Sequence, residues 1–266
     1  MDDADDRSPR TLETVTRACR VIEALEELDG AGVTELADYL GLSKSSTHSY
    51  LATLREQQFV VKSGDTYELG LEFLYLGTAV RHNHTLYRHG SGEIEKLADE
   101  TGEYVHLMAE QHGLERNVYK VAGENAVGAE YHAVKQQRAD YLHVSSTGKA
   151  VLAQLERDRL ERILDRYGLV ERTEHTITDR ETLYDELQRI RERGYAVNDE
   201  EEIRGIRAVG APIVDSDGTV LGALSVSGPT SRFDGEFFYE ELPELVIGSA
   251  NVVEANVNMS SATQSL

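Results

Sequence analysis

Several features that would mark a secreted or membrane protein are missing from this sequence. A single cysteine, Cys19, excludes an internal disulfide, and no apolar stretch approaches the roughly 20 residues that cross a bilayer. The N-terminal MDDADDRSPR is acidic where a signal peptide carries basic and then apolar residues. There is no low-complexity run, and 266 residues suffice for two small domains or one large one. We therefore expect a globular cytoplasmic protein that does not associate with membranes.

Basic charge, and lysine above all, is scarce. The chain has 27 Lys and Arg residues, six of them lysine, against 48 Asp and Glu, which gives a net charge of -21. Such a composition resembles that of proteins from salt-accumulating halophiles, in which salt screens the self-repulsion. An ordinary acidic cytosolic protein is the alternative. The net charge also argues against nucleic-acid binding, but residues 7–70 carry seven basic and ten acidic side chains, a local net of only -3.

The first 70 residues have the pattern of three helices followed by a hairpin. Apolar residues at three- and four-residue steps predict a helix over residues 11–28, with Cys19 buried on its apolar face. A short helix ends at Gly41, and Ser43 caps the next one. Two β-prone runs around Ser-Gly-Asp then indicate a hairpin within residues 59–70. This order predicts a winged helix-turn-helix domain over residues 8–70.

The third helix begins with an unusual density of short polar side chains. These residues lower helix propensity because they compete for backbone hydrogen bonds. In a helix-turn-helix the second helix of the pair enters the major groove by its N-terminal residues, where hydroxyls, a lysine and a histidine can contact phosphates and base edges. Thr47, Leu54 and either Tyr50 or Leu51 are expected on the inward face. The candidate DNA-binding residues are Ser43, Lys44, Ser45, Ser46, Thr47, His48, Tyr50 and, in the wing, Lys62.

Residues 71–89 contain no helix breaker and predict a linking helix. Three histidines lie in it, but His-x-His does not share a helix face, and no cysteine or carboxylate completes a ligand set nearby. We expect no metal and no cofactor. From residue 90 to 258 helical and strand patterns intermix, which predicts an α/β domain on an antiparallel sheet and an α+β chain overall.

Two hydroxyl pairs in this second half suggest a ligand site. The run STGKA lacks the first glycine and the Ser/Thr after lysine that a phosphate-binding P-loop needs, which excludes nucleotide hydrolysis by such a loop. Ser146 and Thr147 still open a helix, where they either cap it or bind a small anion. Ser225 and Ser227 are two apart in a predicted strand, so they lie on one face of the sheet.

The ordered motifs resemble those of the IclR family of transcriptional regulators. LADYLGLSKSSTHSYLATLREQQFV and YELG resemble its DNA-binding half, and TGKAVLA, GYAVNDEE, GIRAVGAPI and ALSVSGP its GAF-like effector domain. The resemblance implies a dimer or tetramer on a double-stranded operator, and a small organic, sugar or aromatic acid as effector. It departs at Ser43, Thr47 and Ser49, where Pro, Val and Arg are common. The implied effector-binding residues are Ser146, Thr147, Asn198, Ile206, Ala208, Ser225 and Ser227, with Asn198 for a common Asp and Ala208 for a common Cys.

Two other classes of function remain open from the sequence. A metabolic enzyme with an accessory helix-turn-helix would need a catalytic set, but no histidine pairs convincingly with a serine or cysteine nucleophile. A scaffold could use the helix-turn-helix for protein contacts alone. The sequence favours a regulator that binds DNA and responds to a metabolite.

Overall fold

The computed structural model describes residues 11–129 and 139–264, with side chains up to residue 260. Two compact units, Met1–Val80 and Arg81–Leu266, make up the chain. Within the described residues, no helix is both long enough and apolar enough to cross a membrane.

The N-terminal unit is a winged helix-turn-helix, as predicted. Gly41 adopts the left-handed conformation, with φ of 65°, and turns the chain between the second and third helices. The wing strands pair antiparallel from Val60↔Leu69 to Ser63↔Thr66. A two-residue strand that the sequence did not predict joins them, in the sheet order β1-β3-β2. The elements are α1 (Glu13–Glu27), β1 (Ala31–Gly32), α2 (Val33–Leu40), α3 (Lys44–Glu56), β2 (Val60–Ser63) and β3 (Thr66–Leu69).

Helix α1 buries only part of the predicted apolar face. Val21, Ala24 and Leu25 enter the core of this unit, whereas Cys19 is exposed. The prediction of a buried Cys19 is wrong, because the helix has two apolar stripes. With about 3.6 residues per turn, positions 12, 15 and 19 lie nearly opposite positions 21, 24 and 25. The core takes only the second stripe.

The predicted linking helix is divided in two. Helix α4 (Glu72–Asn83) ends before His84, which has an extended backbone with ψ of 128° and precedes helix α5 (Thr85–Thr101). Residues 85–89 therefore belong to the first helix of the second unit, where Leu86 is fully buried. No residue of α4 is buried.

The second unit is built on a six-stranded sheet in the order β6-β5-β4-β9-β8-β7, and all its pairings are antiparallel. The prediction of an α/β domain on an antiparallel sheet is confirmed. Strand β7 was not predicted, and the predicted strand at residue 140 is only two residues long. The strands are β4 (Tyr104–Gln111), β5 (Leu114–Ala122), β6 (Asp140–Tyr141), β7 (Ala196–Asp199), β8 (Ile206–Val214) and β9 (Val220–Pro229).

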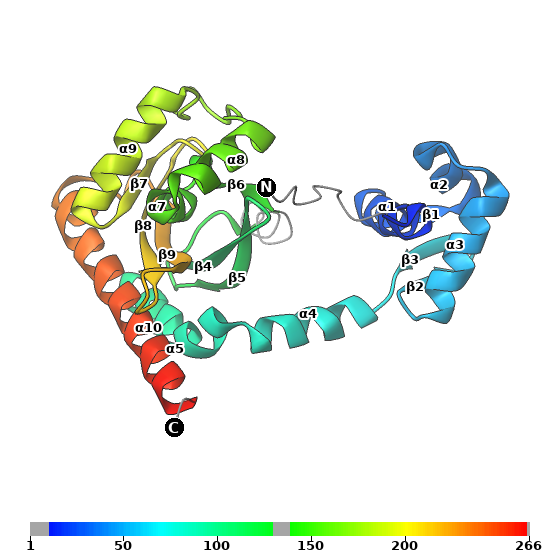
Figure 1. Cartoon of the computed structure of the whole chain (residues 1–266), viewed down its shortest axis with the longest axis horizontal. Helices are drawn as coiled ribbons and strands as arrows, with labels where there is room; N and C mark the ends of the chain where they lie inside the picture. The colour runs from blue at the N-terminus through cyan, green and yellow to red at the C-terminus, as the bar shows by residue number, and fades with distance from the viewer. Residues whose placement is uncertain (1–10, 130–138, 265–266) are drawn as a thin grey trace, which may run out of the picture. The chain divides into compact units, whose positions relative to one another are not determined.

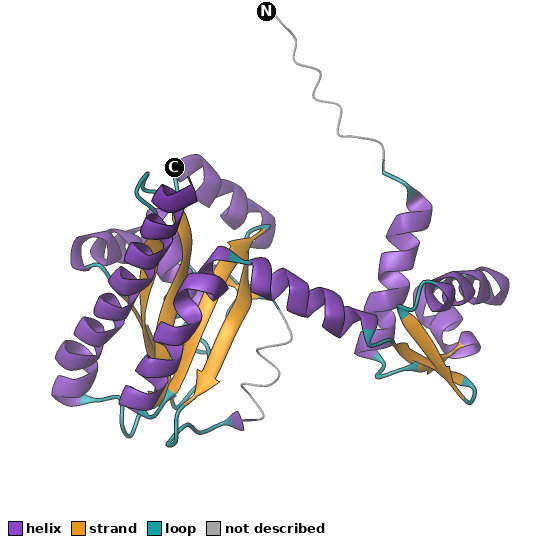
Figure 2. Ribbon diagram, turned by 90° about the horizontal axis from the view of Figure 1, so that it is seen from below, coloured by secondary structure: helices purple, strands orange, loops and turns teal. Residues whose placement is uncertain are grey.

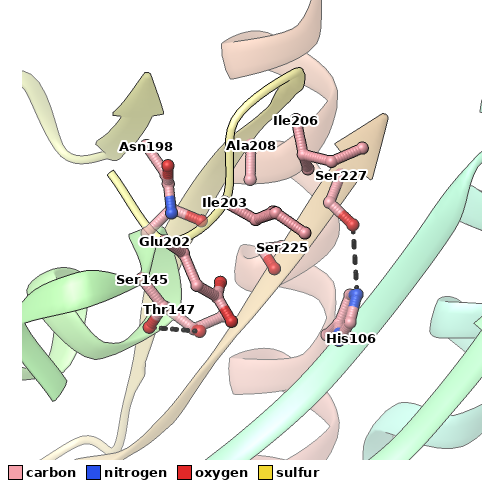
Figure 3. Close-up of a pocket in the computed structure, with 11 residues that line it drawn as sticks. His106, Ser145, Thr147, Asn198, Glu202, Ile203, Ile206, Ala208, Ser225 and Ser227 are labelled. Carbon is pink, nitrogen blue, oxygen red and sulfur yellow. Dashed lines mark hydrogen bonds between the residues drawn. The ribbon is translucent and has the colours of Figure 1, made fainter. Parts of the chain in front are cut away.

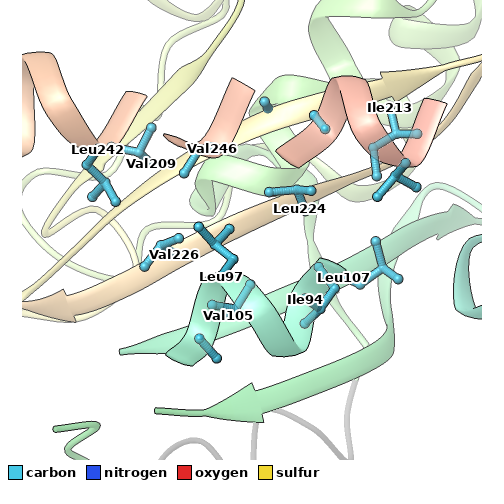
Figure 4. Close-up of a cluster of buried hydrophobic side chains, with 14 of the residues drawn as sticks. Ile94, Leu97, Val105, Leu107, Val209, Ile213, Leu224, Val226, Leu242 and Val246 are labelled. Atoms are coloured by element: carbon cyan, nitrogen blue, oxygen red, sulfur yellow. The ribbon is translucent and has the colours of Figure 1, made fainter. Parts of the chain in front are cut away.

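Helices cover both faces of this sheet (Figures 1 and 2). The face that packs on α5 and α10 is a dry core of aliphatic side chains, including Leu107, Leu224 and Val246 (Figure 4). The other face, against α7 and α9, mixes apolar and polar residues. The predicted effector-binding residues lie among the polar residues of this second face. The helices are α7 (Ser146–Gln154), α8 (Arg157–Tyr167), α9 (Arg180–Arg193) and α10 (Leu242–Gln264), with short turns at Leu142–Val144 and Phe237–Glu241.

Candidate recognition helix and effector pocket

The first turns of α3 present an exposed polar face. Ser43 caps the helix by accepting a hydrogen bond from the Ser46 N–H at 3.1 Å, and its hydroxyl donates to the Ser46 hydroxyl at 2.9 Å. Lys44, Ser45 and His48 are exposed, and the spacing of 44, 45 and 48 puts them on one side of the helix. Lys44 has no ion-pair partner among the described residues. This side can meet a phosphate backbone and a base edge together.

Two of the candidate DNA-binding residues are placed differently. Thr47 is fully buried, and its hydroxyl donates to the Ser43 carbonyl at 3.1 Å, so it belongs to the core and cannot contact DNA. Its selection as a DNA-binding residue is wrong, because the helical periodicity of α3 turns position 47 toward the core. Tyr50 is half-buried on the flank of the helix, and Leu51 and Leu54 complete the inward face. In the wing, Lys62 is exposed and its ammonium lies 5.5 Å from the centre of the Tyr67 ring.

An apolar groove runs between α1 and α3. Val15, Ala18, Cys19 and Ile22 form its α1 side, with Tyr50 and polar residues of α3 opposite. Val15 is 56% exposed although it is large and aliphatic. Exposed apolar surface of this kind marks contact sites.

Cross-strand register gathers the predicted effector-binding residues on one face of the sheet. Asn198 pairs with Ala208, and Ala208 with Ser227. Two residues further along these strands, Gly210 pairs with Ser225, and Ser225 pairs with His106. Directly paired residues lie on the same side of a sheet. All seven predicted residues line one small cavity (Figure 3): Ser146, Thr147, Asn198, Ile206, Ala208, Ser225 and Ser227.

Gly210 brings the start of α7 down onto this face. A methyl group at Gly210 would lie 2.9 Å from the Ser146 carbonyl carbon and 3.0 Å from the Thr147 nitrogen. Only glycine allows the first turn of the helix to approach the strand so closely. The N–H groups of that turn carry the positive end of the helix dipole, which favours an anion or a hydroxyl oxygen.

The hydroxyl groups around the cavity differ in what they already bind. Ser227 is 3.1 Å from His106 Nε2, and Thr147 donates to the buried Glu115 carboxylate at 3.1 Å. Ser146 and Ser225 form no side-chain hydrogen bond within the residues that the structure describes. Both residues are largely buried, but neither hydroxyl oxygen is among the fully buried side-chain atoms that lack a partner, so both oxygens reach the space of the cavity. These two hydroxyls are therefore the ones available to a ligand.

Asn198 contributes hydrogen bonds to the fold as well as lining the cavity. Its amide nitrogen donates to the Val144 carbonyl at 2.9 Å, and its amide oxygen accepts from the Glu201 N–H at 3.0 Å. The amide oxygen and one of the two amide N–H groups are thus occupied.

Four lining residues were missed from the sequence: His106, Ser145, Glu202 and Ile203. A polar residue in the middle of the apolar strand at His106 was a usable signal, because it alternates with buried apolar neighbours. Ser145 could have been found as the N-cap of α7, where it accepts from the Gly148 N–H at 2.9 Å. Glu202 and Ile203 lie in the connection between β7 and β8, whose path over the cavity leaves no periodic signal.

A buried ion pair lies behind the cavity. The Lys149 ammonium is 1% exposed and binds the Glu201 carboxylate, which is itself largely buried. Burial raises the pKa of Glu201, and the nearby Lys149 charge opposes that shift. The second oxygen of Glu201 has no hydrogen-bond partner among the described residues. The pair fastens the start of the β7–β8 connection to α7.

The comparisons with known proteins agree with both halves of this arrangement. The IclR helix-turn-helix domain matches residues 14–64, and the C-terminal domain of bacterial IclR transcriptional regulators matches residues 78–255. The chain belongs to the IclR family of transcriptional regulators. Members of this family bind DNA, carry a C-terminal effector-binding domain and are not enzymes. The alternative of a metabolic enzyme is thereby excluded.

IclR-family relatives are similar along almost their whole length. The probable HTH-type transcriptional regulator ArcR of Halobacterium salinarum is 37% identical over 96% of this chain and 97% of its own. KdgR of Escherichia coli is 30% identical over 90% of this chain and 91% of its own. Among solved structures, Thermotoga maritima IclR covers 93% of this chain and 99% of its own, with a TM-score of 0.72 and 26% identity. An IclR homologue from Microbacterium hydrocarbonoxydans in complex with 4-hydroxybenzoate shares the fold, with a TM-score of 0.78 and 20% identity over 92% of this chain and 98% of that one.

Proposed function

We propose that this regulator binds its operator as a dimer or a tetramer through the exposed side of α3 and the wing, and that a small organic, sugar or aromatic acid in the cavity of the second unit changes that binding. The observation that carries the proposal is that the hydroxyls of Ser146, at the start of α7, and of Ser225, on β9, line the same cavity and form no side-chain hydrogen bond among the described residues. Such groups can bond to a polar ligand. DNA is the site of action, so we infer a cytoplasmic location.

On the DNA side, the proposal assigns distinct roles along α3. Lys44, Ser43, Ser45 and Ser46 approach the phosphates, His48 reaches a base edge, and Lys62 holds the backbone beside the wing. Replacing Lys44 with Ala should weaken binding to all DNA sequences alike, with a salt slope shallower by about 1. His48→Ala should instead alter the preference among operator variants.

The measurement is fluorescence anisotropy on a set of operator variants across a salt series. Lys96→Ala is the matched control, because Lys96 is an exposed lysine paired with Glu93 in the other unit. If Lys44→Ala and His48→Ala both bind every operator as the parent does, α3 is not the recognition helix.

A second copy of the chain is the partner that the apolar surfaces favour. Leu74 and Tyr75 of α4 are 68% and 70% exposed, and no residue of this helix is buried. An amphipathic surface of this size in a helix without buried residues is typical of an interface. A dimer also doubles the length of DNA that is read, which specificity usually requires.

Light scattering tests the assembly. The parent should be a dimer or larger, and Leu74→Glu with Tyr75→Glu should shift it toward monomer. Val61→Glu, in the wing, is the control, since Val61 is also an exposed apolar residue. A stable monomer of the parent at working salt contradicts the proposal.

The effector class follows from the polarity of the residues that line the cavity. Its α7 end offers N–H groups and hydroxyls, while Ile203, Ile206 and Ala208 supply an apolar side. A carboxylate on a short carbon frame satisfies both, and the Microbacterium homologue holds an acid of that type. Calorimetry with a panel of hydroxy, sugar and aromatic acids should find a ligand that Ser225→Ala and Ser146→Ala bind more weakly than the parent. Equal affinity for all three chains would place the ligand elsewhere.

A further inference from the structure

The outward side of α3 extends about two turns beyond His48. The inward positions of the helix are buried: Thr47, Leu51 and Leu54. Helical spacing puts Ser45, Ser49 and Ala52 on the opposite side, where both serines are exposed and Ala52 is half-buried. The middle of the outward side therefore carries small, uncharged side chains over about 10 Å of helix.

A row of basic side chains follows one edge of this outward side. Lys44, His48 and Arg55 are exposed, and at about 100° per residue they lie within about 40° of one another around the helix axis. None of these three side chains forms a hydrogen bond, an ion pair or a ring contact within the part of the chain that the structure describes. In the second unit, by contrast, arginines such as Arg159 are held in ion pairs. In a chain with a net charge of -21, an unpaired basic row fits a polyanion.

The two ends of the basic row are far enough apart to reach both walls of the major groove. Lys44 and Arg55 lie about 16 Å apart along the helix axis, whereas the major groove of B-DNA is about 12 Å wide. A basic side chain at each end can therefore bind a phosphate while the small side chains between them let the helix approach the base edges. Glu56, exposed at the end of α3, carries a charge that repels phosphate and limits the surface there.

The small side chains differ in the base groups that they can contact. The Ser49 hydroxyl donates to the Ser45 carbonyl at 3.0 Å, so toward DNA it can only accept a hydrogen bond. Ala52 offers a methyl group and nothing polar. The matching apolar feature in the major groove is the methyl group of thymine, and alanine is one of the side chains that contact it.

We propose that α3 contacts DNA along its third turn as well as its first: Ala52 packs against a thymine methyl group, and Arg55 binds a phosphate beyond it. This rests on the proposed function, since it extends the surface of the same recognition helix. Ala52 then contributes to the preference among operator sequences, whereas Arg55 contributes affinity for every sequence.

The Ala52 contact is tested on the full chain with operator duplexes that the parent selects from random-sequence DNA. One thymine at a time is replaced by deoxyuridine, which lacks only the methyl group. At one thymine of each half-site the parent should bind the substituted duplex about threefold more weakly, as for the loss of one buried methyl group. Ala52→Gly should bind both duplexes with equal affinity at that thymine and keep the effects at other thymines. Ala255→Gly is the matched control, since Ala255 is an exposed alanine of α10, and it should respond as the parent does.

The Arg55 contact is tested by the salt dependence of binding to the same duplexes. Arg55→Ala should weaken binding to all sequences and make the salt slope shallower by about 1 for each bound subunit, and Arg55→Lys should restore the slope. Arg162→Ala is the matched control, because Arg162 is exposed in α8 and forms no ion pair within the described residues, and it should leave the slope unchanged.

Two results would overturn this extension of the surface. One is a parent that shows no deoxyuridine effect, or an effect that Ala52→Gly retains at every thymine. The other is a salt slope that Arg55→Ala leaves unchanged. The proposed function stands in either case if Lys44→Ala and His48→Ala still alter operator binding, and it fails as well if both bind every operator as the parent does.

Discussion

The buried pair of Lys149 and Glu201 allows a quantitative prediction about stability. Lys149→Met removes the ammonium, keeps most of the volume, and leaves a carboxylate largely buried without its cation. Breaking a buried ion pair in this way costs about 3–5 kcal/mol. With an m value of about 2 kcal/mol/M, the urea midpoint of the second unit should fall by about 2 M. Far-UV circular dichroism follows the transition in a chain that has no tryptophan.

Two further variants separate the loss of the pair from the loss of a lysine. Lys96→Met removes an ammonium whose side chain is 76% exposed and which pairs with Glu93 at 3.2 Å. Its cost should be below about 1 kcal/mol, as for other surface pairs. Lys149→Met combined with Glu201→Leu should recover most of the stability, because replacing both buried charges by apolar side chains is often neutral.

The pH dependence of the stability loss in Lys149→Met follows from the pKa of Glu201. Burial raises the pKa of Glu201 in the folded chain. Such a carboxyl stabilises the fold most in its protonated form, below the unfolded pKa of about 4.3, and this contribution is lost as the pH rises through the folded pKa. Without Lys149 the folded pKa rises further, so the deficit of Lys149→Met should grow as the pH rises above the unfolded pKa. A deficit equal to that of Lys96→Met at every pH would refute the reasoning.

Three other predictions concern the two units and the whole surface. Thr47→Val should destabilise the helix-turn-helix by about 1 kcal/mol through loss of the hydroxyl bond to Ser43 and leave operator preference unchanged in anisotropy; a changed preference would return Thr47 to the DNA interface. Gly210→Ala should lower the free energy of unfolding in urea by about 1–3 kcal/mol and weaken effector binding, because its methyl group would press on the start of α7. Gly77→Ala is the control and should lower neither, because Gly77 has open space around it. The midpoint of thermal unfolding should rise with increasing KCl concentration, since salt screens the net charge of -21. A falling midpoint would contradict adaptation to a cell interior that is rich in salt.

The most successful sequence predictions were those that rest on short local patterns, such as the two-residue repeat of a strand. The two-residue alternation of Ser225 and Ser227 placed both on one sheet face, and that face does line the cavity. The hairpin around Ser-Gly-Asp was also recoverable, since Gly64 at its turn has φ of 61°, a conformation that favours glycine.

What failed depends on contacts between distant segments. Helical spacing shows an apolar stripe that includes Cys19, but not that the core lies on the other stripe of α1. Nothing periodic marks the break at His84, where no breaker residue stands. The bonds that occupy Asn198 reach Val144, 54 residues away along the chain, and the connection that carries Glu202 has no regular structure. Contacts between segments that are far apart in the sequence decide these positions, and a local sequence pattern does not show them.

The central claim is that an acid in the cavity of the second unit changes operator binding by α3. Its most direct test is quantitative footprinting of the full chain on DNA upstream of its own gene, with and without the best ligand of the acid panel, for the parent and Ser225→Ala. The account predicts protection of an imperfect palindrome whose midpoint the ligand shifts by about tenfold or more in the parent and far less in Ser225→Ala. An equal shift in both chains, or no protected site, would contradict it.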